Sequence, residues 1–267
     1  MIGAIAGDII GSVYEFDPAK TKDFQPLFHP RAHFTDDTVL TVAVADSLLH
    51  DRDPVAAFKD WGHRYPDCGW GGTFAYWLFS DRTEPYGSFG NGAAMRISPV
   101  GLVAGSLDRA HALSDRFTRI THDHPEGLKG AAATVTAILL CRKGKSTLTC
   151  EEIRCLIEVG YGYDLSRSVA QIRPGYGFDE TCQGTVPEAI TCALEASDFE
   201  DAVRNAVSLG GDADTLGAIT GGIAEARFGV PRVIAEEVRK RLPQDMQEIM
   251  EALYERAGTA CPWQTST

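Results

Sequence analysis

Two short acidic clusters in the 267-residue chain hold the residues whose types and spacing could do chemistry. The clusters are Thr35-Asp36-Asp37-Thr38 and Asp212-Ala213-Asp214-Thr215. No Lys or Arg lies within 34–47 or within 205–225, so the neighbouring sequence offers no counter-charge. Carboxylates that lie close together repel one another unless water or a cation compensates them. If the fold joins the clusters, their carboxylates and hydroxyls would form an all-oxygen site for Mg²⁺ or Mn²⁺.

Helix capping is the alternative explanation of each cluster. Asp and Thr are common N-cap residues, and acidic residues in a first helical turn are stabilised by the helix dipole. A cap needs one oxygen acceptor, whereas each cluster offers two carboxylates and neighbouring hydroxyls. The presence of two near-copies in one chain therefore favours a metal site over capping alone.

The spacing of apolar residues predicts that helices position these clusters. Helices are expected at 39–49, 54–65, 128–142, 150–159, 186–195, 199–208, 215–228 and 231–242. Pro54, Pro187 and Pro231 stand where a first helical turn accepts proline. Alternating strand patterns are absent. We therefore expect an all-α fold, a compact orthogonal helical bundle that forms one domain over 1–267, with the acidic clusters at helix N-termini.

Small residues in the 215–228 helix predict close packing against another helix. Gly217, Gly221 and Gly222 lie on it, together with Ala218 and Ala224. Each helical glycine costs about 1 kcal/mol relative to alanine, so the run needs a packing or site reason. Our hypothesis is that the second acidic cluster must approach the first closely.

Two glycine-rich loops, at 69–74 and 86–92, interleave glycines with aromatic residues. Such loops expose backbone N–H groups that can bind phosphate, and aromatic rings can stack on a base. Trp70, Phe74 and Tyr163 are candidates to flank an adenine. Plain turn chemistry is the alternative, since neither loop matches a known phosphate-loop fingerprint.

Composition limits the possible classes of protein. A net charge of −12 argues against general nucleic-acid binding and against binding to anionic membranes. Seven cysteines without metal-site spacing favour free thiols in a reducing compartment. Neither a signal peptide nor a membrane span is evident, so we expect a cytoplasmic protein. Because no apolar helix face stands out as exposed, we expect a monomer.

These motifs together resemble the ADP-ribosylglycohydrolase family, of the dinitrogenase-reductase-activating type. The resemblance rests on Gly-Asp-Ile-Ile-Gly-Ser at 7–12, Phe-Thr-Asp-Asp-Thr at 34–38, Gly-Asn-Gly-Ala-Ala-Met-Arg at 90–96 and Gly-Gly-Asp-Ala-Asp-Thr at 210–215. It covers nearly the whole chain in order. The two aspartate motifs are specific as a pair, whereas either one alone would be a weak signal.

The resemblance implies an all-α hydrolase with two Mg²⁺ or Mn²⁺ ions. It would cleave the bond between C1 of the terminal ribose of ADP-ribose and an acceptor side chain, and release ADP-ribose. The implied metal ligands are Thr35, Asp36, Asp37, Asp212, Asp214 and Thr215. Among them, Asp214 is expected to bridge both ions. Metals suit this reaction because hard cations can chelate the ribose diol.

The resemblance also implies catalytic and substrate-binding residues. Glu15 matches the glutamate of members that act on serine-linked ADP-ribose, and it is expected to be catalytic together with Asp36 and Asp37. The implied substrate-binding residues are Gly71, Gly87, Ser88, Phe89, Gly90, Asn91 and His122. Some arginine-specific members carry aspartate at the position of Ser88, so this serine favours the O-linked branch. A solvated loop acid is the alternative for Glu15.

Two other functions remain open at this point. A non-catalytic ADP-ribose sensor could share the fold, although Glu15 beside intact metal motifs argues against it. The His122-Asp123 pair also suggests an HD-type metal phosphohydrolase, with His29, His33 and His63 as further ligands. That function would not explain the paired aspartate motifs. The acceptor stays unspecified: arginine, serine, polymer, small molecule or nucleic-acid base.

Overall fold

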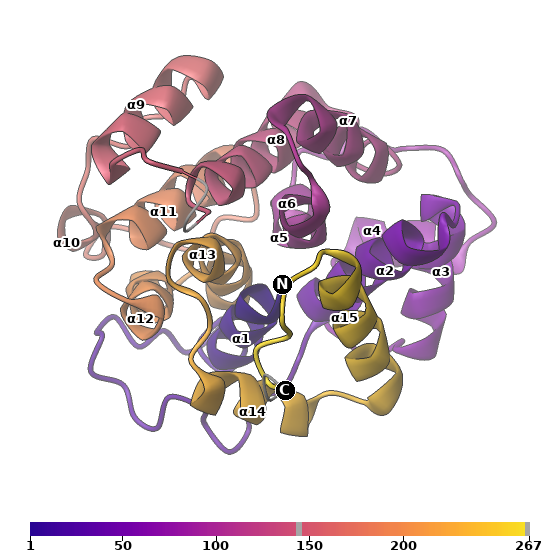
Figure 1. Ribbon diagram of the computed structural model, residues 1–267, viewed down its shortest axis with the longest axis horizontal. Helices are drawn as coiled ribbons and strands as arrows, with labels where there is room; N and C mark the ends of the chain where they lie inside the picture. Colours follow the sequence, from indigo (N-terminus) through magenta and orange to yellow (C-terminus); the bar gives the residue numbers. More distant parts are fainter. Residues whose placement is uncertain (143–145, 265–267) are drawn as a thin grey trace.

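The computed structural model describes residues 1–142 and 146–264, and the described chain is all-α, as the sequence predicts (Figure 1). The helices are α1 (Ile2–Gly11), α2 (Asp36–His50), α3 (Pro54–Arg64), α4 (Gly72–Phe79), α5 (Gly92–Met95), α6 (Ser98–Val103), α7 (Leu107–Thr118), α8 (Pro125–Leu140), α9 (Cys150–Tyr161), α10 (Val169–Ile172), α11 (Cys182–Glu195), α12 (Phe199–Leu209), α13 (Ala213–Phe228), α14 (Arg232–Arg241) and α15 (Gln244–Arg256). An isolated bridge between Gly90 and Thr181 is the one β-type pairing in this described part.

Each predicted helix is present, with ends that differ by a few residues. The prediction for Pro187 was wrong, because α11 begins at Cys182 and Pro187 lies inside it. Proline removes one helical N–H donor there; Gln183, whose carbonyl would accept that bond, is exposed to water. Pro54 does occupy the first turn of α3. Helices α1, α4 to α7, α10 and α15 were not predicted.

The most consequential unpredicted helix is α1, which packs along α13 near the centre of the molecule (Figure 1). All ten of its residues are buried, and no side chain caps its N-terminus. Three glycines and four β-branched isoleucines give this segment a weak intrinsic helix propensity, which is why it was not predicted. The glycines of α13 do pack closely against a helix, as predicted, but that helix is α1 and not the helix that follows the first acidic cluster.

Glycines on both helices allow the backbones of α1 and α13 to touch. A Cβ atom on Gly7 would lie 1.9 Å from the carbonyl oxygen of Gly217, and one on Gly221 would lie 2.0 Å from that of Gly3. At Gly11 the corresponding distance to the Ala213 oxygen is 2.3 Å. No side chain fits in these gaps, so the close approach depends on glycine.

Replacing Gly7 by alanine is therefore expected to lower the free energy of unfolding by about 1–3 kcal/mol, because the added methyl group would force α1 and α13 apart. The matched control is Gly160→Ala in α9, where nothing lies within 4 Å of the new Cβ. That change should stabilise the protein by about 0.5–1 kcal/mol through helix propensity. Urea unfolding measures both values, and equal effects would contradict the packing argument.

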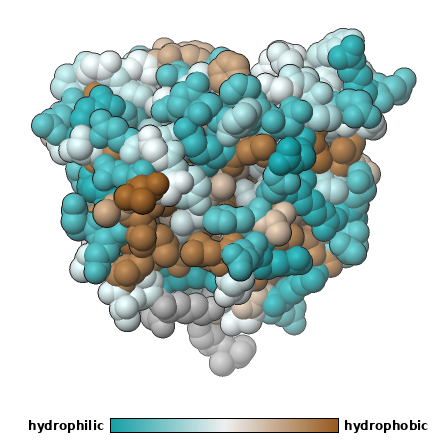
Figure 2. All heavy atoms as spheres, turned by 90° about the horizontal axis from the view of Figure 1, so that it is seen from above, coloured by the Kyte–Doolittle hydropathy of each residue, from teal (hydrophilic) through white to brown (hydrophobic). Residues whose placement is uncertain are grey.

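The surface over α7, α8 and α9 is mostly hydrophilic, with hydrophobic residues gathered in patches (Figure 2). On α9, the side chains of Leu156 and Val159 are exposed. No helix in the described ranges combines the length and the apolar character that crossing a bilayer requires. The expectations of a single domain, a monomer and a cytoplasmic location stay predictions.

Candidate functional site

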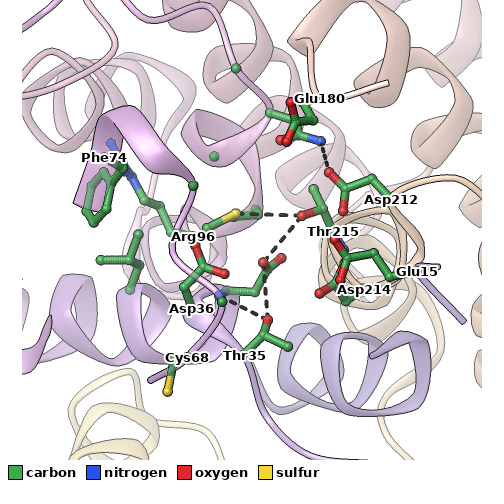
Figure 3. Close-up of a pocket in the computed structure, with 18 of the residues that line it drawn as sticks. Glu15, Thr35, Asp36, Cys68, Phe74, Arg96, Glu180, Asp212, Asp214 and Thr215 are labelled. Atoms are coloured by element: carbon green, nitrogen blue, oxygen red, sulfur yellow. Dashed lines mark hydrogen bonds between the residues drawn. The ribbon is translucent and has the colours of Figure 1, made fainter. Parts of the chain in front are cut away.

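Folding brings the two acidic clusters together, as the sequence predicts. Helices α2 and α13 begin at the clusters, and both N-termini face one cavity of about 510 Å³ (Figure 3). Across a separation of 178 residues, the Thr215 hydroxyl donates to Asp37 Oδ2 at 3.3 Å. Glu15, on the loop after α1, lines the same cavity. The cavity therefore collects the acidic residues from three distant parts of the chain.

Capping accounts for only one of the two clusters. Thr35 is the N-cap of α2, and its side chain accepts a hydrogen bond from the Asp37 N–H at 3.4 Å. Asp212 occupies the N-cap position of α13 but makes no side-chain cap bond. Instead, Asp212 Oδ2 accepts a hydrogen bond from the side-chain amide of Asn91 at 2.7 Å (Figure 3). The carboxylate of Asp212 is thus turned toward the cavity residues and away from its own helix.

Two glycines place Asp212 at this point. Gly210 and Gly211 both have φ of +71°, a conformation that side chains rarely adopt. A Cβ atom on Gly211 would also lie 2.5 Å from the Gly177 oxygen. The chain can therefore enter α13 in this direction only with glycine before the aspartate.

Asp8 of α1 organises the first cluster, a role that was not predicted from the sequence. Its fully buried carboxylate accepts hydrogen bonds from the N–H and hydroxyl of Thr35, at 3.0 and 2.7 Å. It also accepts from the N–H of Thr38, at 3.1 Å, and from the Thr38 hydroxyl. Since α1 packs on α13, Asp8 links the start of α2 to the helix of the second cluster. A lone acid in an otherwise apolar segment was the signal that could have revealed it.

The environment of the cavity disfavours the charged form of its aspartate side chains. Burial, with repulsion from neighbouring carboxylates, raises the pKa of Asp36, Asp37 and Asp212 well above its usual range. Burial raises the pKa of Asp214 to about 7, and the carboxylates of Asp8 and Glu15 add to the rise. Such buried, mutually repelling groups are the environment that a bound cation would relieve.

An oxygen without a partner supports the same interpretation. Among the described residues, Asp37 Oδ1 is buried and makes no hydrogen bond. The surrounding donors are carboxylate and hydroxyl oxygens, which Mg²⁺ and Mn²⁺ prefer. The donor set therefore fits a hard divalent cation.

Glu15 belongs to the strongest candidate metal group. Carboxylate oxygens of Glu15, Asp212 and Asp214 lie within 4.8 Å of one another, the only such group of three or more His, Cys, Asp or Glu residues in the part of the chain that the structure describes. The resemblance of the sequence implies a catalytic role for Glu15 and not a role as a ligand. This triad could hold one ion, and it shows no binuclear arrangement.

The pKa of Glu15 is raised to about 7. Burial is the largest cause, and repulsion from Asp212, Glu180 and Asp8 adds to it. Near neutral pH, Glu15 can therefore be either charged or protonated, which suits a group that transfers protons.

The geometry does not favour the HD-type phosphohydrolase, although His33 and His122 line the cavity. The candidate metal group contains no histidine. Asp123 Oδ1 accepts a hydrogen bond from the Gly87 N–H at 2.7 Å, so it stabilises the loop. The imidazole of His63 bonds to the Lys59 carbonyl at 2.6 Å.

Most of the predicted substrate-binding residues line the cavity. Gly71, Ser88, Gly90, Asn91 and His122 do, whereas Gly87 and Phe89 are not among its lining residues. The hydroxyl of Ser88 accepts a hydrogen bond from the Gly90 N–H at 3.2 Å, so Ser88 shapes the loop. The side-chain amide of Asn91 donates hydrogen bonds to Asp212 Oδ2 at 2.7 Å and to the Thr185 hydroxyl at 3.1 Å.

Of the three aromatic candidates for adenine binding, Phe74 alone lines the cavity. Trp70 stacks on Phe74 with ring centroids 5.4 Å apart and does not line it. Tyr163 is buried beneath Lys129, outside the cavity. The sequence showed that aromatics lie near glycines, but not which of them face the same space.

A further carboxylate and an aromatic pair stand at the edge of the cavity. Glu180 lines the cavity, and its negative charge raises the pKa of Glu15. Phe16 is 82% exposed and stacks with Phe178 at a centroid distance of 6.1 Å. These residues come from the loops after α1 and before α11, and no sequence motif indicated them.

Several known proteins are similar to this chain. ADP-ribosylhydrolase ARH3 of Danio rerio is 26% identical, covering 87% of this chain and 82% of that protein. The ADP-ribosyl-[dinitrogen reductase] glycohydrolase of Rhodospirillum rubrum is 27% identical, covering 96% of this chain and 95% of that protein. An uncharacterized protein of Archaeoglobus fulgidus is 31% identical over 179 residues, and that match spans 61% of this chain and 57% of the relative.

The fold is shared with a solved structure described as an ADP-ribosylglycohydrolase-related protein complex. The TM-score is 0.70 with 24% sequence identity, over 96% of this chain and 97% of the other. Residues 1–263 match the ADP-ribosylglycohydrolase family. A match over almost the whole chain, with the paired aspartate motifs meeting in one cavity, shows that the protein belongs to the ADP-ribosylglycohydrolase family.

Proposed function

We propose that this protein hydrolyses the glycosidic bond between ADP-ribose and a modified acceptor, with the aid of divalent metal ions. The observation that carries the proposal is the meeting of Asp37 with Thr215, and of Glu15 with Asp212 and Asp214, in one cavity. A metal-binding sensor would keep the metal ligands as well, so the carboxylate of Glu15 beside them is what favours hydrolysis over sensing. Family membership supports the reaction class.

Two Mg²⁺ or Mn²⁺ ions are the proposed cofactors. Their proposed ligands are Thr35, Asp36, Asp37, Asp212, Asp214 and Thr215, and Glu15 lies close to the carboxylates of Asp212 and Asp214. When bound, the ions would supply Lewis-acid chelation of the ribose diol. Asp8 and Asn91 orient this set, because they hold Thr35 and Asp212 by hydrogen bonds.

Glu15 is the proposed catalytic carboxylate. As the acceptor departs, positive charge develops on the ribose, and a nearby carboxylate stabilises that charge. With a pKa of about 7, Glu15 can also take a proton from the attacking water at its carboxylate oxygen. Asp36 and Asp37, which line the same cavity, would add negative charge near the ribose.

The loop at 86–92 and His122 are proposed to bind the diphosphate and distal ribose of ADP-ribose. The proposed partners are ADP-ribosylated proteins or other ADP-ribosyl conjugates, handled by a cytoplasmic monomer. The hydroxyl of Ser88 accepts a hydrogen bond from the Gly90 N–H and keeps its own hydrogen for a ligand, so the preference for an O-linked acceptor stays part of the proposal.

The deciding experiment is a panel of ADP-ribosyl conjugates incubated with the protein and Mg²⁺ or Mn²⁺. It should include arginine, serine, polymer and nucleobase linkages. We expect release of ADP-ribose from at least one conjugate, and loss of that activity in excess chelator. Release of nothing, together with tight binding of ADP-ribose, would instead identify the protein as a sensor.

A further inference from the structure

Arg96 is a buried cation at the wall of the cavity, near Phe74 and Asp36 (Figure 3). It is fully buried, and it is the one Lys or Arg among the described residues that line the cavity. Its guanidinium lies 4.8 Å from the centre of the Phe58 ring. Within the described chain, Nε and Nη1 make no hydrogen bond, and only Nη2 does. Such a group is costly to bury, so its position calls for a specific role.

The bonds of Nη2 converge on one side of His122. Nη2 donates to Thr121 Oγ1 at 2.8 Å and to the Phe117 carbonyl at 3.3 Å, and it lies 3.4 Å from His122 Nδ1. Thr121 Oγ1 is itself 2.8 Å from His122 Nδ1. A guanidinium can only donate, so a hydrogen on Nδ1 would face the hydrogens of Arg96. The neighbours therefore favour Nδ1 as an acceptor, with the Thr121 hydroxyl donating to it.

This arrangement leaves the hydrogen of a neutral imidazole on Nε2, which lies against the Gly90–Gly92 turn of the cavity. A Cβ atom built on Gly92 would lie 3.3 Å from His122 Nε2, and one on Gly90 would lie 3.6 Å from it. The hydrogen bonds of the described residues include none to Nε2. His122 is 4% exposed and lines the cavity, so a ligand is the available acceptor for this N–H.

The charge of the imidazole is controlled by the same neighbours. Burial, followed by the positive charge of Arg96, lowers the pKa of His122 well below its usual range. The Tyr86 ring also faces the imidazole, with ring centroids 6.2 Å apart, and the charges of Tyr86, Cys182 and Asp36 act on Arg96. Burial lowers the pKa of Arg96 itself to about 10, so the guanidinium keeps its charge at neutral pH.

We propose that Arg96 is a positioning residue that holds His122 as the neutral Nε2–H tautomer, so that the imidazole donates one hydrogen bond to a phosphate of a bound nucleotide diphosphate. The identity of that ligand rests on the proposed function, whereas the tautomer does not.

The test is ¹⁵N NMR of histidine-labelled, metal-free protein, with the His122 signals assigned by their loss in His122→Gln. We expect wild-type His122 to show the Nε2–H tautomer and no titration between pH 5.5 and 8. In Arg96→Gln, the loss of the positive charge should raise the His122 titration midpoint by about one pH unit or more and mix the tautomers. The matched control is Arg116→Gln, which removes an exposed arginine stacked on Phe117 and should behave as wild type.

A second variant keeps the test decisive if Arg96→Gln does not fold. Thr121→Val removes only the hydroxyl that donates to Nδ1, and it should also shift the tautomer population. Calorimetric titration of the metal-loaded protein with ADP-ribose should show about tenfold weaker binding for Arg96→Gln, and no further loss when that change is added to His122→Gln.

Three results would overturn the proposal: a wild-type His122 protonated on Nδ1, a wild-type His122 charged at pH 7, or wild-type tautomers in both Arg96→Gln and Thr121→Val. If the tautomer is as expected but ADP-ribose does not bind, the proposed function fails and the role of Arg96 stands.

Discussion

Replacing Asp214 by asparagine is expected to abolish hydrolysis of ADP-ribosyl conjugates while making the metal-free protein more stable at pH 8. Asp214 lies in the candidate metal group with Glu15 and Asp212, so its loss removes a central anionic ligand. The same carboxylate is buried among other carboxylates. An amide in its place would relieve that repulsion, and we expect about 1–3 kcal/mol of added stability without metal.

The pH dependence of this effect has a definite sign. The pKa of Asp214 in the folded protein is about 7, above the ordinary value of 3.8 that applies when the chain is unfolded. Between these two pH values the folded protein holds a proton on Asp214 that the unfolded chain has released. Protonation of Asp214 therefore contributes its full stabilisation of the fold below about pH 4, and this contribution is lost as the pH rises through 7. Metal-free wild type should consequently be less stable at pH 8 than at pH 5.5, and Asp214→Asn should flatten that difference.

Thermal unfolding at both pH values, with and without Mg²⁺ or Mn²⁺, measures this prediction together with metal occupancy. The matched control is Asp67→Asn, because Asp67 is an exposed carboxylate that lines the same cavity. It should retain wild-type metal binding and stability. Full turnover in Asp214→Asn, or a metal-free variant less stable than wild type at pH 8, would contradict the proposed metal site.

Replacing Glu15 by glutamine is expected to slow hydrolysis by about 10²–10³-fold while changing ADP-ribose affinity by less than about threefold. Glutamine keeps the shape of the side chain, but it can neither carry the negative charge nor accept a proton from water. Single-turnover rates and calorimetric binding separate the two effects. An unchanged rate would show that Glu15 is not the catalytic carboxylate.

Glu180→Gln is the matched control for Glu15, since both carboxylates face the cavity edge and repel each other. Without the charge of Glu180, the pKa of Glu15 should fall, so the acidic limb of the pH–rate profile should move to lower pH while the maximal rate changes little. Metal content should be measured in both variants. A large loss of metal in Glu15→Gln would assign Glu15 to the ligands and not to proton transfer.

Local patterns were enough to predict the secondary structure that positions the clusters. Apolar spacing and good helix formers revealed α2 and α13 to within a few residues at each end. The same patterns missed α1, which is rich in glycine and isoleucine, and α5, which has four residues. It also placed Pro187 in a first turn, because proline is more often found there than in the interior of a helix.

The residues that act through a neighbour could not be found from local patterns. Asp8 acts on Thr35 and Thr38 through hydrogen bonds, and Arg96 lies against His122 and Thr121. Their partners are 25 to 30 residues away in the sequence. Nothing in the composition of a segment shows which distant group its side chain will meet.

The sequence by itself determined the all-α fold, the paired aspartate motifs and the need for a counter-charge, because these follow from residue type and short-range spacing. Only the tertiary structure decided that Glu15 joins Asp212 and Asp214, that Asn91 holds Asp212, and that Tyr163 stays outside the cavity. The physical reason is the contact between α1 and α13. Their glycines let two backbones touch, and that contact brings the loop carrying Glu15 to the N-terminus of α13.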